Sequence, residues 1–173
     1  RSDLQTGTEL DREMLRASDR VMDKYFPSQI PTEAHTEVAQ NIFESAGRDH
    51  QTVHDHMLGT HGDDGDDFLH DINTIDWPDD GKAARSLVDW TNEASTGPRS
   101  DIASATAEKY AHYLGDHEDQ LMAINGGQSL GELNPELTRG YAHGLTPYMA
   151  DIASFSSGNN GDHFGMLDPG DPE

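Results

Sequence analysis

The chain contains no cysteine among its 173 residues, which excludes disulfide bonds, thiolate metal sites and cysteine nucleophiles. This absence is compatible with a reducing cytosol and equally with an exported helical protein. The chain begins at Arg1 rather than at a methionine, so we expect it to be a processed or excised piece of a longer polypeptide. Its localisation stays open between the cytoplasm and export as part of a larger protein.

Long apolar runs are missing as well. No stretch approaches the roughly 20 residues of a membrane-spanning helix, and the N-terminus lacks the apolar segment of a signal peptide. We therefore expect no insertion into a membrane. Leu, Ile, Val and Phe together make up only 29 residues, and with the high charge this composition lies near the border of intrinsic disorder. The spacing of the apolar residues therefore decides whether the chain folds.

Basic residues are scarce: 11 Lys and Arg stand against 33 Asp and Glu, and the formal net charge is −22. This charge repels phosphate backbones and anionic membrane surfaces, so we expect no binding to nucleic acid. It attracts basic protein surfaces, cationic peptides and divalent metal ions, and it also keeps the protein soluble. The expected partner is a basic protein surface or another domain of the parent polypeptide.

Apolar residues recur at three-to-four spacing, which is typical of amphipathic helices. One stripe contains Leu10, Met14, Val21 and Met22, and a second contains Val38, Ile42, Phe43 and Ala46. Further helical stretches are predicted at 48–59, 68–75, 84–91, 99–115, 118–124 and 135–152.

Capping and breaking residues mark the ends of these stretches. Thr8 is expected to cap the first helix, and Gly47 and Gly59 to end the second and third, with Gly47 in a left-handed C-cap. Asn134-Pro135-Glu136 predicts a helix start with Asn134 as the cap, and Pro147 predicts a kink.

The segment WPDDGKAARSLVDW, from Trp77 to Trp90, raises the question of what its acidic turn does. Asp79-Asp80-Gly81 lacks the ligand spacing and closing Glu of a calcium loop and the Ser or Thr of a phosphate-binding loop. We therefore interpret it as a helix start in which Asp80 accepts a backbone N–H. The two tryptophans are expected to anchor the core.

These patterns predict an all-α fold, because period-two strands are absent and β-branched residues are sparse. We expect an irregular bundle of about six to eight helices in one domain over residues 1–155. A Gly/Asn/Pro-rich irregular tail is expected over residues 156–173. No tetratricopeptide consensus with its period of about 34 residues is evident, so a regular solenoid is not expected.

Candidate metal ligands are of two kinds. The loop HGDDGDDFLHD could bind calcium through Asp63, Asp64, Asp66 and Asp67, but no closing Glu follows and a solvated loop is the favoured interpretation.

The other candidates are histidines. His50 and His54 are four residues apart, which places them on one helical face, and Asp55 follows directly. Two imidazoles with this spacing can bind zinc or nickel with carboxylates completing the shell. Ten histidines in an acidic chain also produce such pairs by chance, and no His-Glu-x-x-His is present, so solvated or capping histidines are the favoured interpretation.

Catalytic residues cannot be assigned. The chain's Ser, His and Asp residues form no triad pattern, and no pair stands out among its 33 acids. We therefore predict no catalytic residue and no cofactor.

Four stretches resemble the helical region of large actinobacterial, chiefly mycobacterial, proteins described as containing a TPR repeat region. They are SAGRDHQTVHD (Ser45–Asp55), FLHDINTIDWPDDGKAARSLVDW (Phe68–Trp90), SLGELNPELTRGYAHGLTPYMADIA (Ser129–Ala153) and the closing FGMLDPGDPE. The similarity covers roughly residues 40 to 173. Those proteins often resemble type VII secretion or polymorphic-toxin architectures, so the resemblance implies an all-α module inside a longer polypeptide and supplies no catalytic residues. This chain has neither a Trp-x-Gly turn nor a Tyr-x-x-x-Asp/Glu export signal, so we do not expect export of the piece alone.

Three functional hypotheses follow. The leading one is a non-enzymatic acidic helical scaffold or protein-interaction module, with apolar grooves for binding and negative charge for selecting basic partners. An alternative is a metal-binding module or metal-dependent hydrolase that uses the His50–His70 cluster. A third is an acidic immunity or inhibitor protein for a basic toxin, which the net charge alone supports.

Overall fold

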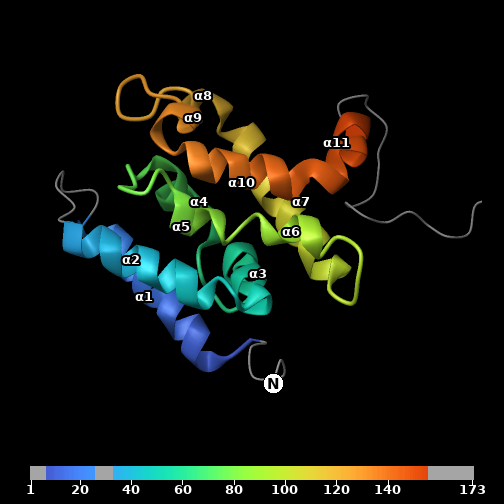
Figure 1. The fold of residues 1–173 in the computed structure, drawn as a ribbon, viewed down its shortest axis with the longest axis horizontal. Coiled ribbons are helices and arrows are strands. Elements are labelled where there is room, and N and C mark those ends of the chain that lie inside the picture. The colour runs from blue at the N-terminus through green and yellow to red at the C-terminus, as the bar shows by residue number, and fades with distance from the viewer. Residues whose placement is uncertain (1–6, 26–32, 156–173) are drawn as a thin grey trace, which may run out of the picture.

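The computed structural model describes residues 7–25 and 33–155, and these form a helical bundle (Figure 1). Over these ranges the chain has eleven α-helices, one 3-10 turn and no strand, and an isolated β-bridge joins Ile124 to Gln128. None of the helices in these ranges is long and apolar enough to cross a membrane. The all-α prediction is confirmed, whereas the predicted tail lies outside the described residues.

Seven helices have at least seven residues, which agrees with the predicted six to eight. They are α1 (Glu9–Tyr25), α2 (Glu33–Ala46), α3 (His50–Leu58), α4 (Gly65–Thr74), α7 (Ser100–Asp116), α10 (Pro135–Leu145) and α11 (Met149–Phe155). Single-turn helices are α5 (Lys82–Arg85), α6 (Trp90–Glu93), α8 (Glu118–Leu121) and α9 (Leu130–Leu133), and the 3-10 turn is η2 (Thr146–Tyr148).

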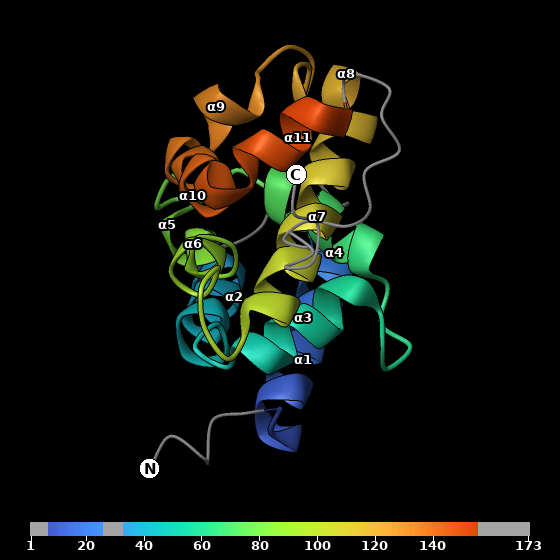
Figure 2. The ribbon, with the colours of Figure 1, turned by 90° about the vertical axis from the view of Figure 1, so that its right-hand side faces the viewer.

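Helices far apart in sequence lie side by side. α1 packs along α2, and α3 contacts α4, α1 and α7 (Figures 1 and 2). α5 contacts both α2 and α10, and α10 also lies against α6. The core between these helices is formed by apolar side chains from all of the longer segments, including Leu15, Met22, Phe43, Met57, Leu69, Ile72, Trp77, Leu87 and Leu137.

The buried face of α1 differs from the predicted stripe. Leu15, Ser18 and Met22 are fully buried, whereas Leu10 is 71% exposed. Leu10 lies in the first turn of α1, which projects from the bundle in Figure 2. On α2 the buried residues include Ala39 and Phe43, while Val38 is exposed. The sequence pattern therefore located both helices but misplaced part of their contact faces.

Of the caps predicted at Thr8, Gly47 and Gly59, two are confirmed. The Asp11 N–H donates to the Thr8 hydroxyl at 3.1 Å, and Gly59 ends α3 in the left-handed region with φ 69°. Gly47 is not left-handed, so its predicted C-cap is wrong. Position 47 needs glycine because there is no room for a side chain. A Cβ there would lie 2.4 Å from the Phe43 carbonyl oxygen and 2.9 Å from the Ser86 hydroxyl.

The acidic turn after Trp77 starts a helix, as predicted, but with a different carboxylate. Asp79 accepts the N–H groups of Gly81 at 3.1 Å and Ala83 at 2.8 Å. Asp80 and Gly81 both have positive φ, so the chain turns sharply and Asp80 points elsewhere. The predicted helix over 84–91 is also interrupted, because the N–H groups of residues 86–88 bond three residues back between α5 and α6.

Both tryptophans are buried, as predicted. The Trp77 indole N–H donates to the Ile72 carbonyl at 2.9 Å, and its ring meets the edge of Phe43 at a centroid distance of 5.5 Å. The Trp90 indole N–H donates to the Leu87 carbonyl at 3.0 Å. Each large apolar ring therefore has its one polar group satisfied locally.

Asn134 precedes α10 as predicted, but its side chain does not cap the helix. The fully buried amide donates to the Ile75 carbonyl at 2.8 Å and accepts the Trp77 N–H at 3.3 Å. Glu136 N–H instead donates to the Asp80 carbonyl at 3.0 Å. The start of α10 is thus bound to the chain between α4 and α5. The helix predicted over 135–152 with a kink at Pro147 is instead divided into α10, which ends at Leu145, the η2 turn that contains Pro147, and α11.

Glycine allows α10 to approach α6 and α7 closely. A Cβ on Gly144 would lie 2.4 Å from the Tyr110 hydroxyl and 2.7 Å from both the Thr91 hydroxyl and the Val88 carbonyl oxygen. The Thr91 hydroxyl lies 2.7 Å from the Tyr110 hydroxyl and 3.1 Å from the Gly144 carbonyl. This buried hydroxyl network therefore occupies the space that a side chain would need.

Replacing Gly144 by Ala should destabilise the fold by about 1–3 kcal/mol, the usual range for overpacking a core. Gly115→Ala is the matched control, because Gly115 lies in α7 with nothing within 4 Å of its Cβ position. We expect that control to be neutral or stabilising by up to about 1 kcal/mol. Urea unfolding of the two variants measures the difference, and equal stabilities would contradict the packing described.

Candidate functional site

The predicted metal ligand His50 faces an aromatic ring. Its imidazole is half-buried and stacks on Trp90 with centroids 4.3 Å apart and planes 11° from parallel. Burial and the positive charge of Arg99 lower the pKa of His50 below its ordinary value. His50 is therefore held against the core at the junction of α3 and α6.

His54 and Asp55 face other partners. The Nδ1 atom of His54 lies 3.0 Å from the Thr106 hydroxyl on α7, and burial lowers the pKa of His54. Asp55 accepts a hydrogen bond from the Gln51 amide at 2.8 Å and lies 3.3 Å from the His61 imidazole. Across residues 7–25 and 33–155 no three His, Asp or Glu side chains are placed to hold one metal ion, so the metal site over His50, His54 and Asp55 stays a prediction.

A different histidine, His56, is buried among carboxylates. His56 is 1% exposed, and its Nε2 lies 2.8 Å from Asp19 on α1 while its Nδ1 lies 3.4 Å from Asp63. Asp63 also binds the Arg16 guanidinium at 2.7 Å. Burial opposes ionisation of Asp63, but the hydrogen bond from Arg16 and the His56 ring hold the pKa of its carboxyl below the ordinary value.

The sequence did not single out this network. His56 lies in the histidine-rich stretch, but Asp19 and Arg16 are contributed by α1, about 40 residues earlier in the chain. The available local signal was that His56 shares a helical face with the apolar residues Val53 and Met57, both fully buried. That signal indicates burial but not the ionic partner.

Four aspartates meet where α1 packs on α4. Asp19 and Asp23 are one turn apart on α1, and Asp67 and Asp71 are one turn apart on α4. Burial, followed by the negative charges of Asp67, Asp23 and Asp19, raises the pKa of Asp71 to about 7. Burial and the negative charges of Asp67 and Asp19 raise the pKa of Asp23. We call these four residues the acidic seam.

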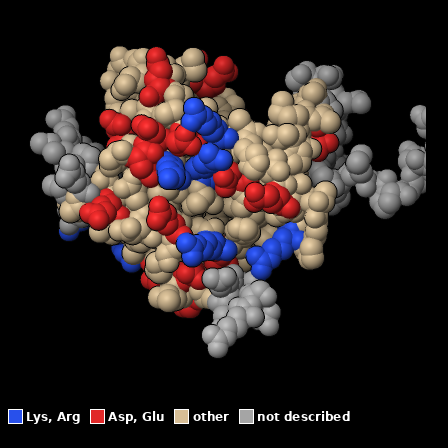
Figure 3. Space-filling view, viewed as in Figure 1, with Lys and Arg blue, Asp and Glu red and all other residues tan. Residues whose placement is uncertain are grey.

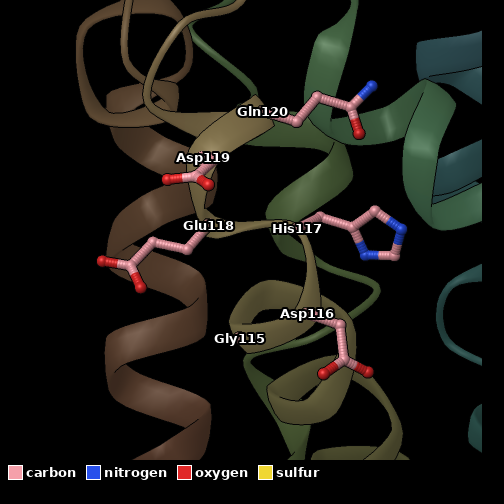
Figure 4. A pocket seen from close by; sticks show the side chains of 6 residues that line it. All are labelled: Gly115, Asp116, His117, Glu118, Asp119 and Gln120. Atoms are coloured by element: carbon pink, nitrogen blue, oxygen red, sulfur yellow. The ribbon is translucent and has the colours of Figure 1, made fainter.

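A shallow hollow of about 320 Å³ lies at the turn between α7 and α8. Its lining is Gly115, Asp116, His117, Glu118, Asp119 and Gln120. Figure 4 shows Asp116 and His117 on one side of the turn and Glu118 and Asp119 on the other. The His117 ring stacks on Tyr113 at 4.2 Å. The hollow offers three carboxylates to solvent and no hydroxyl or thiol nucleophile, so it suits recognition of cations better than covalent chemistry.

Several of the few basic side chains form ion pairs with acids. Figure 3 shows acidic residues spread over one face with a small group of basic ones among them. Arg85 binds Asp89 at 2.9 Å and Glu136 at 3.1 Å, and Arg139 also contacts Glu136. Ion pairs to acidic residues also involve Arg12, Arg16 and Lys109. The remaining acids therefore leave the surface with an uncompensated negative charge.

A family of helical repeat proteins matches the first half of this structure. The model of a family described as a TPR repeat domain matches residues 1–90 of the 173-residue chain. The chain belongs to the TPR repeat domain family. The matched residues contain the helix pairs α1–α2 and α3–α4, and pairs of this kind are the unit of TPR proteins. No curated protein and no solved structure matches the chain significantly.

This match confirms the predicted resemblance to a TPR repeat region in part. The resemblance was placed over roughly residues 40 to 173, whereas the family match covers residues 1–90. The expectation that the chain forms no regular solenoid stays a prediction. Membership of the family indicates a helical scaffold for protein–protein interaction.

The metal prediction can be tested by thermal melts after chelator treatment, with zinc, nickel, calcium or magnesium added at fixed ionic strength. An ion that binds only the folded chain raises Tm by mass action. Because His50 and His54 face Trp90 and Thr106, we expect all four ions to act alike and added NaCl to reproduce their effect. A rise specific to zinc or nickel that His50→Ala and His54→Ala abolish would establish the site instead.

Proposed function

We propose that the chain is a non-enzymatic helical scaffold that binds a basic protein surface. The observation that carries the proposal is the net charge of −22 on a TPR-family fold, in which Arg16, Arg85 and Lys109 are already paired with acids. A surface of this kind attracts cationic partners over a distance of about 10 Å in moderate salt and repels anionic ones. Complementary charge of this type speeds association and selects partners more than it adds affinity.

The α7–α8 hollow is the proposed contact for a partner's Lys or Arg side chains. Asp116, Glu118 and Asp119 are exposed, and no Lys or Arg contributes to the lining. Carboxylates project from both sides of the turn, so an approaching basic surface meets one on either side (Figure 4). A lysine or arginine side chain needs no preformed deep pocket for such a contact, because its charged end remains partly hydrated.

We further propose that the chain works inside a larger actinobacterial protein with a type VII secretion or polymorphic-toxin-like architecture. Support comes from the similarity of Phe68–Trp90 and Ser129–Ala153 to such proteins. In that setting the basic partner is another protein or another domain of the same polypeptide. The acidic surface then selects its neighbour without any reaction at this module.

Binding of a labelled Lys/Arg-rich helical peptide, measured by fluorescence anisotropy, tests the proposal. The triple variant Asp116→Asn/Glu118→Gln/Asp119→Asn should weaken binding about tenfold at about 0.05 M salt, since exposed charge pairs contribute about 0.2–1 kcal/mol each. The effect should largely disappear at about 0.2 M salt, because counterions then screen the remaining attraction.

The matched control removes three exposed charges elsewhere, with Glu37→Gln/Glu44→Gln/Glu93→Gln. It lowers the net charge equally, so it should weaken binding by less than about twofold if the hollow is the contact. Equal losses in the two triple variants would show that only total charge matters. A peptide with Gln in place of Lys and Arg that bound as tightly would overturn the proposal of a basic partner.

A further inference from the structure

The turn between α8 and α9 contains an Asn-Gly pair, Asn125-Gly126 (Figure 1). Both residues have positive φ, 50° for Asn125 and 90° for Gly126, as the two central residues of a type I′ turn do. The Ile124 carbonyl accepts the N–H groups of Gly127 at 3.1 Å and Gln128 at 3.0 Å, and the Ile124 N–H donates to the Gln128 carbonyl at 2.8 Å. The flanking residues therefore close the turn, and Asn125 and Gly126 take no part in these hydrogen bonds.

The two groups of this pair that can react with each other are both free. Within residues 7–25 and 33–155, the Asn125 carboxamide and the Gly126 N–H have no hydrogen-bond partner. Both residues are exposed, and nothing lies within 4 Å of the Cβ position of Gly126 or Gly127. Because neither glycine carries a side chain and the space around them is open, the peptide group that joins residues 125 and 126 can rotate toward the carboxamide.

The other asparagines of the described ranges lack this combination. Asn73 and Asn134 are fully buried, and their amides donate to backbone carbonyls, as does the amide of Asn92. Asn41 lies inside α2, where the next N–H belongs to the helix. None of the four is followed by glycine, and Pro135 has no N–H. A free carboxamide beside a free and unhindered N–H therefore occurs only at Asn125 in the described part of the chain.

We propose that Asn125 is a modification site, at which the chain deamidates spontaneously to aspartate and isoaspartate. The Gly126 nitrogen loses its proton to base and attacks Cγ of Asn125. A C–N bond forms, the Cγ–Nδ2 bond breaks, and ammonia leaves with a proton from solvent, so that a cyclic succinimide remains. Water then opens the ring, at Cγ to give aspartate or at the backbone carbonyl to give isoaspartate. The reaction needs water alone as co-reactant and does not depend on the proposed basic partner.

The two products act differently on the turn. Either one adds a negative charge to a chain that already carries −22. Isoaspartate also routes the backbone through the side-chain carbon, which inserts a methylene into a turn that joins two buried anchors, Ile124 and Leu130. Because the turn is closed by short bonds between Ile124 and Gln128, we expect isoaspartate to break this bridge and aspartate to preserve it.

Peptide mapping of the full chain tests the site, after incubation in mildly alkaline buffer well below the melting transition. Deamidation at Asn125 should be at least about tenfold faster than at Asn92, which is also partly exposed. The second Asn-Gly pair of the sequence, Asn160-Gly161, lies on a different tryptic peptide and outside the described residues, so it does not interfere.

Asn125→Gln is the control variant, because its longer side chain would have to close a less favourable, larger ring. The modification at this position should therefore disappear in the variant. A rate at Asn125 less than about tenfold above that at Asn92, or an undiminished signal in Asn125→Gln, would overturn the proposed site.

Hydrogen exchange of the Ile124 N–H measures the effect on the turn, because this group donates in the bridge. The isoaspartate form, separated by chromatography and recognised by an isoaspartate methyltransferase, should exchange at least about tenfold faster than the unmodified chain. Freshly purified Asn125→Asp is the matched control, since it carries the same charge on a normal backbone, and it should exchange as slowly as the unmodified chain. A difference of less than about tenfold between the isoaspartate form and Asn125→Asp would contradict the proposed opening of the turn.

Discussion

The buried amide of Asn134 joins three backbone groups that precede it by 57 to 61 residues. It donates to the carbonyls of Asn73 and Ile75 and accepts the N–H of Trp77, so a polar side chain with no access to water is fully used. These contacts fix the start of α10 against the end of α4. The family match ends at residue 90, but the packing continues beyond it, because α10 lies on α5 and α6.

Polar contacts of this kind accompany a core with few large apolar residues. Three buried polar side chains each contact an element distant in sequence. Thr91 contacts α10, Asp49 contacts the start of α1, and His56 contacts the middle of α1. Buried polar groups favour one packing of the helices, because any other packing would leave them without hydrogen-bond partners. Most of the described acids lie at the surface.

Local signals in the sequence predicted where helices begin and end, but not which side chains meet. The Thr8 cap and the Gly59 C-cap depend on neighbours within a few residues, and these predictions are confirmed. Asn134 was predicted to cap a helix because Pro135 and Glu136 follow it, whereas its hydrogen-bond partners lie in the turn after α4. His56 was missed for the same reason, since Asp19 is supplied by another helix. Contacts across the fold have no signature in a single sequence.

Asn134→Ala is the most direct test of the claim that this amide joins the two parts of the chain. It would leave the Ile75 carbonyl and the Trp77 N–H buried without a partner, so we predict a loss of about 3 kcal/mol or more in the free energy of unfolding, still in one transition. Asn92→Ala is the control, because it removes an exposed amide bonded to the His143 carbonyl and should cost less than about 1 kcal/mol. The measurement is urea unfolding followed by both far-UV circular dichroism and tryptophan fluorescence. Equal losses in the two variants, or separate transitions for the two signals in the unmodified chain, would contradict the account.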